Sequence, residues 1–153
     1  MRKRGAHFHR HIDPHAGLHA IAMNRPLDAS QKTDESLALR VSLEALRTGR
    51  NVEAAFHAIT AAVNVSMVLC ERKVGPEHLP AILHAQDSLL RVWQRAQQTG
   101  KWLFDGPGWQ RVLHAIDLHE AQLATISRRE ASEALYEVIR RINQGLVCEA
   151  QRA

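Results

Sequence analysis

The stretch that decides the fold is residues 52–73, VEAAFHAITAAVNVSMVLCERK. One apolar stripe runs along it at helical spacing, formed by Val52, Ala55, Phe56, Ile59, Val63 and Cys70. A second stripe lies on the far side, formed by Ala54, Ala58, Ala61, Val65 and Val68. A helix that is apolar on both faces is central to its fold. We therefore predict that other helices surround this one, or that its second face meets another subunit.

Local signals bound this central helix. Asn51 is a candidate N-cap, and Gly75 with Pro76 ends the helical pattern. The uncharged run from residue 54 to residue 70 is seventeen residues long, which is the lower limit for a membrane span. Because it is rich in alanine and includes polar side chains, we interpret it as a buried helix of a soluble fold and predict no membrane contact.

The pattern stays helical on both sides of this stretch. We predict four further helices, over residues 34–48, 77–99, 107–126 and 128–143. Their boundaries are indicated by Asp34 and Asp105 as N-caps, glycines at 49 and 100, and a capping box from Ser127 to Glu130. No strand pattern occurs and the connections are short. The sequence therefore predicts an all-α, up-and-down bundle of about five helices.

Some predicted helices carry more apolar surface than one contact requires. Residues 34–48 place Leu37 and Val41 on one side and Leu39, Leu43 and Leu46 on another, which suggests two contacts. In the last helix we predict that Ala131, Leu135, Val138 and Ile142 face inward. The loop over residues 101–108 carries Trp102, Leu103 and Phe104 in succession, and we expect it to plug one end of the bundle.

The N-terminal residues differ from the rest of the chain in charge and in hydrophobic pattern. Its 153 residues are typical of one domain. We predict an irregular or partly ordered arm over residues 1–32 and a bundle over residues 33–153. The overall charge of +4 belongs to the first twelve residues, since the remainder carries sixteen basic and sixteen acidic side chains. A neutral body lacks the broad basic face that nucleic-acid binding uses, whereas a basic arm can hold phosphate.

Targeting and cysteine signals point to a reducing compartment. Cys70 and Cys148 fit no metal-ligand spacing and no disulfide framework. The basic N-terminus is not followed by the apolar segment of a secretory signal. We therefore expect a cytoplasmic protein, in which Cys70 packs in the core and does not react.

The search for catalytic chemistry finds few candidates. No Gly-x-Ser-x-Gly, phosphate-binding glycine loop, His-Glu-x-x-His or Cys-x-x-Cys motif occurs, so we predict no catalytic residue, no cofactor and no small-molecule substrate. Helical phase turns His57, His84 and His114 away from the core, which argues against a metal site inside the bundle. His119 faces inward, and we predict that it contacts Gln86 as a structural pair.

Three functions remain open. The leading hypothesis is a non-enzymatic interaction protein that self-associates or binds a partner helix, with an interface at Leu39, Leu43, Leu46, Ala54, Ala58, Ala61, Val65 and Val68. The second is a nucleic-acid-associated protein that uses Arg2, Lys3, Arg4 and Arg10. The third is a metal-binding protein that uses His7, His9, His11, His15 and His19.

Overall fold

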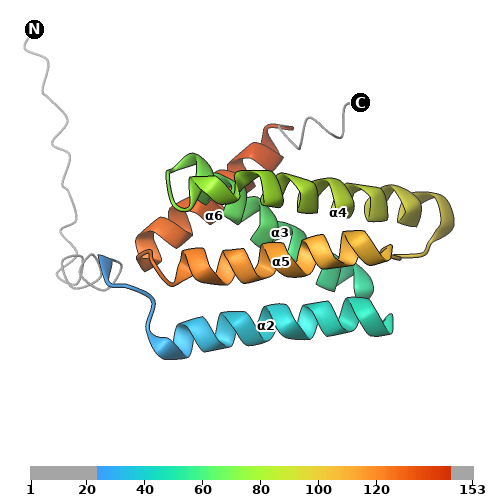
Figure 1. The fold of residues 1–153 in the computed structure, drawn as a ribbon, viewed down its shortest axis with the longest axis horizontal. Coiled ribbons are helices and arrows are strands. Elements are labelled where there is room, and N and C mark those ends of the chain that lie inside the picture. Colours follow the sequence, from blue (N-terminus) through green and yellow to red (C-terminus); the bar gives the residue numbers. More distant parts are fainter. Residues whose placement is uncertain (1–23, 146–153) are drawn as a thin grey trace, which may run out of the picture.

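The fold was examined in a computed structural model that describes residues 24–145. Five α-helices and one short 3-10 helix follow one another in this range: α2 (Ala29–Thr48), α3 (Val52–Glu71), η1 (Pro76–His78), α4 (Leu79–Thr99), α5 (Gly106–Leu123) and α6 (Arg128–Asn143). The described residues contain no strand, only an isolated antiparallel bridge between Pro26 and Ser127. The predicted all-α helical bundle is confirmed (Figure 1).

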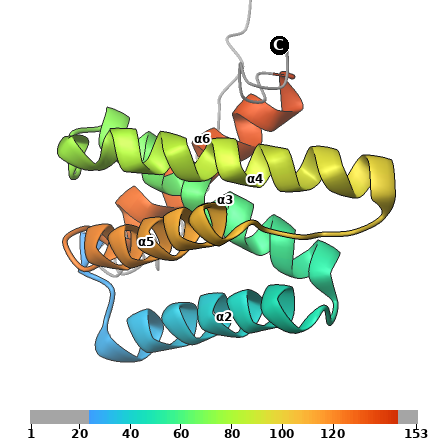
Figure 2. The ribbon, with the colours of Figure 1, turned by 45° about the vertical axis from the view of Figure 1, so that its right-hand side comes forward.

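Helix α3 is the centre of the bundle. In Figure 1, α2, α4 and α5 run roughly alongside one another, with the chain reversing direction between α4 and α5. Figure 2 shows α3 running obliquely through the space between α4 and α2. Helix α3 packs against α2, α4, α5 and α6. The prediction of a central helix is therefore confirmed.

The two apolar faces of α3 are explained by two hydrophobic clusters. The first cluster joins α3 to α2, α4 and α5 around the fully buried side chains of Ile59, Val63 and Ile82. The second joins α3 to α6 through Val65, Val68 and Leu69 on α3 and through Ala134 and Val138 on α6. Part of the second apolar stripe of α3 is thus covered by the chain itself.

The start of the first described helix differs from the prediction. Helix α2 begins at Ala29 and not at Asp34, so it includes four residues that the sequence assigned to the arm. Asp28 is its N-cap: the Asp28 carboxylate accepts from the Gln31 backbone N–H at 2.8 Å, and the Gln31 side chain accepts from the Asp28 N–H at 3.2 Å. This reciprocal capping box satisfies two amide donors, which a lone cap at Asp34 would not do.

Other helix boundaries mostly follow the sequence. Ser127 and Glu130 form the predicted capping box, and Asp105 caps α5 by accepting from the Gly108 N–H at 2.6 Å. Asn51, in contrast, makes no capping hydrogen bond, because its backbone is left-handed with a φ of 47°. The tight turn after Gly49 uses the tolerance of asparagine for that conformation, and its side chain is not available as a cap.

The loop between α4 and α5 covers one end of the first cluster, as predicted. The Trp102 ring lies 4.8 Å from the Phe56 ring, and Phe104 lies 5.4 Å from Trp109, measured between ring centroids. Leu103 differs from its neighbours, because it is exposed.

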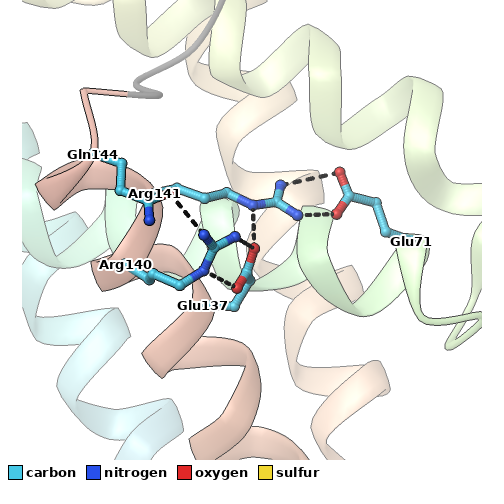
Figure 3. A network of polar contacts seen from close by, with 5 residues as sticks. All are labelled: Glu71, Glu137, Arg140, Arg141 and Gln144. Atoms are coloured by element: carbon cyan, nitrogen blue, oxygen red, sulfur yellow. Dashed lines mark hydrogen bonds and ion pairs between the residues drawn. The ribbon is translucent and has the colours of Figure 1, made fainter.

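An ion network fixes the far end of α6 to α3 (Figure 3). The Arg141 guanidinium donates to both carboxylate oxygens of Glu71, at 2.6 and 3.2 Å, and to Glu137 at 2.7 Å. Arg140 also donates twice to Glu137. The two guanidinium groups lower the pKa of the Glu137 carboxyl to about 2. This network joins the end of α6 to the end of α3 beside the apolar contact between the two helices.

Helix α3 is long and apolar enough to span a membrane by length and composition, and half of its most apolar window is buried inside the bundle.

Candidate functional site

A polar cluster lies in the otherwise apolar contact between α3 and α5. Ser66 on α3 is fully buried, and His119 and Gln122 on α5 are 1% and 3% exposed. Ser66 shares the α3 face of Cys70, one helical turn away, and His119 shares the α5 face of Gln122. Four polar or sulfur-bearing side chains therefore meet across one helix pair.

Hydrogen bonds tie this cluster together. The Ser66 hydroxyl lies 2.9 Å from Nδ1 of His119. The Gln122 amide nitrogen donates to the Val74 carbonyl at 2.9 Å and to the Ser66 carbonyl at 3.3 Å. It also lies 3.2 Å from the Cys70 sulfur. The second nitrogen of His119, Nε2, is buried and has no hydrogen-bond partner within the described residues.

A half-open cavity of about 320 Å³ adjoins His119 between α2, α3, α5 and α6. It is lined by Leu27, Glu35, Leu39, Ala58, Ala61, Ala62, Val65, His119, Leu123, Arg128, Ala131, Ser132 and Leu135. Most of these side chains are apolar, and a few polar groups converge among them. This combination is typical of ligand pockets.

Glu35 covers the free nitrogen of His119. One Glu35 carboxylate oxygen lies 3.5 Å from His119 Nε2, at the margin of a hydrogen bond, and the Glu35 side chain is 45% exposed. Arg128 lies on the α6 side of the same cavity and has no ion pair among the described residues. The lining of the cavity therefore includes an acidic, an imidazole and a basic side chain.

An exposed apolar ridge adjoins the cavity on α6. We call Leu135, Ile139 and Ile142 the α6 ridge; their exposed fractions are 44%, 46% and 49%. They recur at i, i+4 and i+7, so they lie on one face of the helix. Leu135 also lines the cavity, which makes the ridge continuous with it. Leu135 and Ile142 were predicted to face inward. For these two residues the prediction was wrong; it is confirmed for Val138 and Ala131, which pack in the second cluster with Ala134.

The predicted interface residues separate into two groups. Leu39, Leu43, Leu46, Val65 and Val68 are buried within the chain, the first three against the first cluster and the two valines under α6. Side chains buried within the chain cannot face a partner, so the predicted interface is wrong for these five residues. On α2 the exposed apolar side chains are Leu37 and Val41, at 60% each.

Three small residues of the predicted interface stay open. Ala54 and Ala58 are exposed and Ala61 is half-buried, and they continue the face of Val65 and Val68 toward the start of α3. We call these three residues the alanine strip. Ala58 and Ala61 also line the cavity, so the strip and the α6 ridge belong to one face of the molecule.

The histidine predictions had mixed outcomes. His57, His84 and His114 are exposed, and His119 is buried, all as predicted. The predicted contact between His119 and Gln86 is wrong. Gln86 donates to Asn64 at 2.8 Å, whereas His119 pairs with Ser66. Helical phase gives the direction of a side chain but not the height at which two helices meet, and Ser66 stands at the level of His119.

Cys70 packs in the core as predicted. It is 2% exposed, its thiol donates to the Gly75 carbonyl at 3.2 Å, and burial raises its pKa. Cys148 lies outside the described residues.

The candidate residues of the arm also lie outside the described residues. They are His7, His9, His11, His15 and His19 for metal, and Arg2, Lys3, Arg4 and Arg10 for nucleic acid. Within residues 24–145 no group of three or more metal-ligating side chains comes together.

Sequence reasoning missed Ser66, Gln122, Glu35 and Arg128. The signal for Ser66 and Gln122 was present, since each is a polar residue at an inward position of an apolar helix face. Glu35 also had a signal, because it stands one helical turn before Leu39 in the helix predicted over residues 34–48.

Comparison with protein-family models, with curated proteins and with solved structures finds no match.

Proposed function

We propose that the protein is a non-enzymatic helical interaction module that self-associates through the face formed by the α6 ridge and the alanine strip. The observation that carries the proposal is the ridge itself. Three large aliphatic side chains in a row are each between two-fifths and one-half exposed, beside the face of α6 that is buried on α3. A contiguous apolar face of this kind commonly marks a partner surface.

The shape of this face fits a second copy of the same chain. The ridge projects from α6, whereas the neighbouring strip of α3 is low because its side chains are methyl groups. A two-fold axis can place the ridge of each copy over the alanine strip of the other. Such an interface is self-complementary, which is the requirement for a symmetric dimer.

The proposal that the protein is not an enzyme is supported by the burial of Ser66, the nucleophile nearest to His119. Ser66, His119 and Glu35 stand in the order of a nucleophile, a base and an orienting acid. A catalytic serine must reach a substrate carbonyl, however, and Ser66 is fully buried behind the imidazole. We infer that the Ser66–His119 pair is structural.

The test is the molar mass of the full chain in solution, measured by size-exclusion chromatography with light scattering. We expect twice the 17.2 kDa chain mass. Ile139→Glu and Ala54→Glu should each return the mass of a single chain, because each buries a charge in the proposed interface. Leu83→Glu on α4 is the matched control, since Leu83 is 45% exposed but lies outside this face. A wild-type monomer at millimolar concentration, or equal dissociation by Leu83→Glu, would overturn the proposal.

The two alternative functions stay predictions. Salt-dependent DNA binding that is lost on deleting residues 1–12 would support the nucleic-acid function. Zinc or nickel binding that raises the stability of the folded body would support the metal function.

A further inference from the structure

We propose that the cavity beside His119 binds a small, uncharged, largely apolar molecule that carries a hydroxyl group. This inference goes beyond self-association and does not depend on it. It rests on a histidine that is 1% exposed and whose Nε2 atom has no hydrogen-bond partner in the described residues.

The hydrogen bond to Ser66 assigns the role of Nε2. When the Ser66 hydroxyl donates to Nδ1, the neutral imidazole carries its proton on Nε2. The opposite tautomer would leave the Ser66 hydroxyl proton without an acceptor among the hydrogen bonds of this fully buried residue. The Nε2–H is therefore a donor, and leaving such a group unpaired in the interior costs roughly 1–3 kcal/mol. A ligand acceptor that meets it recovers this loss.

Glu35 supplies the complementary acceptor. Its carboxylate oxygen is 3.5 Å from Nε2, and the exposed side chain can rotate to admit a ligand oxygen between the two groups. A hydroxyl oxygen accepts from the Nε2–H while its own proton is donated to Glu35, so one group makes both bonds. Glu35, the group nearest Nε2, disfavours an anionic head group there by repulsion, and an ammonium group has no lone pair with which to accept from the Nε2–H.

The remaining walls fit an apolar body. Leu39, Val65, Leu123 and Leu135 surround a floor of alanines. A cavity of about 150 Å³ is sufficient for benzene. The 320 Å³ here accommodates a substituted ring or a short branched chain.

The experiment is a titration of the full chain by calorimetry with three probes of matched shape: 4-propylphenol, propylbenzene and 4-propylbenzoate. We expect the phenol to bind at least tenfold more tightly than either of the others. Equal affinities for phenol and hydrocarbon, or no binding by a folded chain, would overturn the proposal.

Variants locate the site. Ala58→Leu fills the cavity and should abolish binding, whereas Ala38→Leu, on an exposed face of α2 outside the cavity, should not change it. His119→Phe should remove the preference for phenol over propylbenzene. Should that buried variant fail to fold, Glu35→Ala at its exposed position should still weaken phenol binding selectively. Unchanged phenol binding in both Ala58→Leu and Glu35→Ala would exclude this cavity.

The Ile139→Glu chain separates this proposal from self-association. Ile139 does not line the cavity, so this variant keeps the whole site and should bind the phenol at least as tightly as the wild type, in which a partner ridge over Ala58 and Ala61 would compete with the ligand. Loss of phenol binding in that chain would contradict the assignment of the site.

Discussion

At the scale of single residues, the polar contacts between α3 and α5 fix how these helices meet. The Ser66–His119 hydrogen bond, at 2.9 Å, links two side chains that are almost fully buried. Replacing Ser66 by alanine leaves His119 Nδ1 without its partner. We expect the free energy of unfolding to fall by about 1–3 kcal/mol, measured by urea denaturation.

Ser42→Ala is the control for this experiment. The Ser42 hydroxyl donates within its own helix, to the Ala38 carbonyl at 2.9 Å, and its loss should change the stability by less than about 0.5 kcal/mol. If the two substitutions lowered the free energy of unfolding equally, the buried Ser66–His119 pair would contribute no more to stability than an exposed hydrogen bond within one helix.

The same residues show what the sequence predicts at this scale. The inward position of His119 and the exposed positions of three other histidines follow from helical phase alone. The partner of His119 does not, because it depends on the relative height of the helices: Ser66 stands level with His119, whereas Gln86 on α4 donates to Asn64 on α3. The cavity was not predicted for the same reason: it lies between α2, α3, α5 and α6, and is a property of four helices together.

At the scale of elements, the orientation of α6 is determined by small residues and by ions. Ala134 and Val138 pack on α3, and Arg141 clamps Glu71 and Glu137 at the far end. The sequence placed the start of α6 correctly, through its capping box. The prediction of the inward face is confirmed for Ala131 and Val138 and is wrong for Leu135 and Ile142, because large aliphatic residues weigh most in a helical pattern whereas close packing on α3 selects the smaller side chains.

Glu137 makes the contribution of α6 to stability depend on pH. Its pKa is lowered to about 2 from an ordinary value of 4.5, so its contribution to stability is complete above about pH 5 and is lost as the pH falls toward 2. We expect Glu137→Gln to be less stable than the wild type at pH 7, with the difference closing between about pH 4.5 and 2. Urea denaturation across this range, at low salt, measures it.

Asp34→Asn is the matched substitution, because Asp34 makes no ion pair among the described residues. If the difference in the free energy of unfolding between Glu137→Gln and the wild type stayed constant down to pH 2, the ion network would not have this role. Added salt should narrow the stability difference at pH 7, since Arg140 is 44% exposed, Glu137 is only partly buried and screening reaches the pair.

At the scale of the whole molecule, α3 belongs to both hydrophobic clusters and therefore couples them. Val63 contributes to the first cluster and Val68 to the second, and both are essentially inaccessible to solvent. If one central helix supports both clusters, loss of the second cannot leave the first intact, and unfolding should be a single cooperative transition.

Val68→Ala tests this coupling. Trp102 and Trp109 pack against the first cluster, so tryptophan fluorescence reports on a region that Val68 does not belong to. We expect the substitution to lower the stability by about 1–3 kcal/mol, and to shift the urea midpoint seen by fluorescence as far as the midpoint seen by circular dichroism. Val63→Ala, within the first cluster, should shift both midpoints in the same way. A Val68→Ala chain whose fluorescence midpoint stays at the wild-type value would show instead that α6 and its cluster unfold separately, with α3 anchored by the first cluster alone.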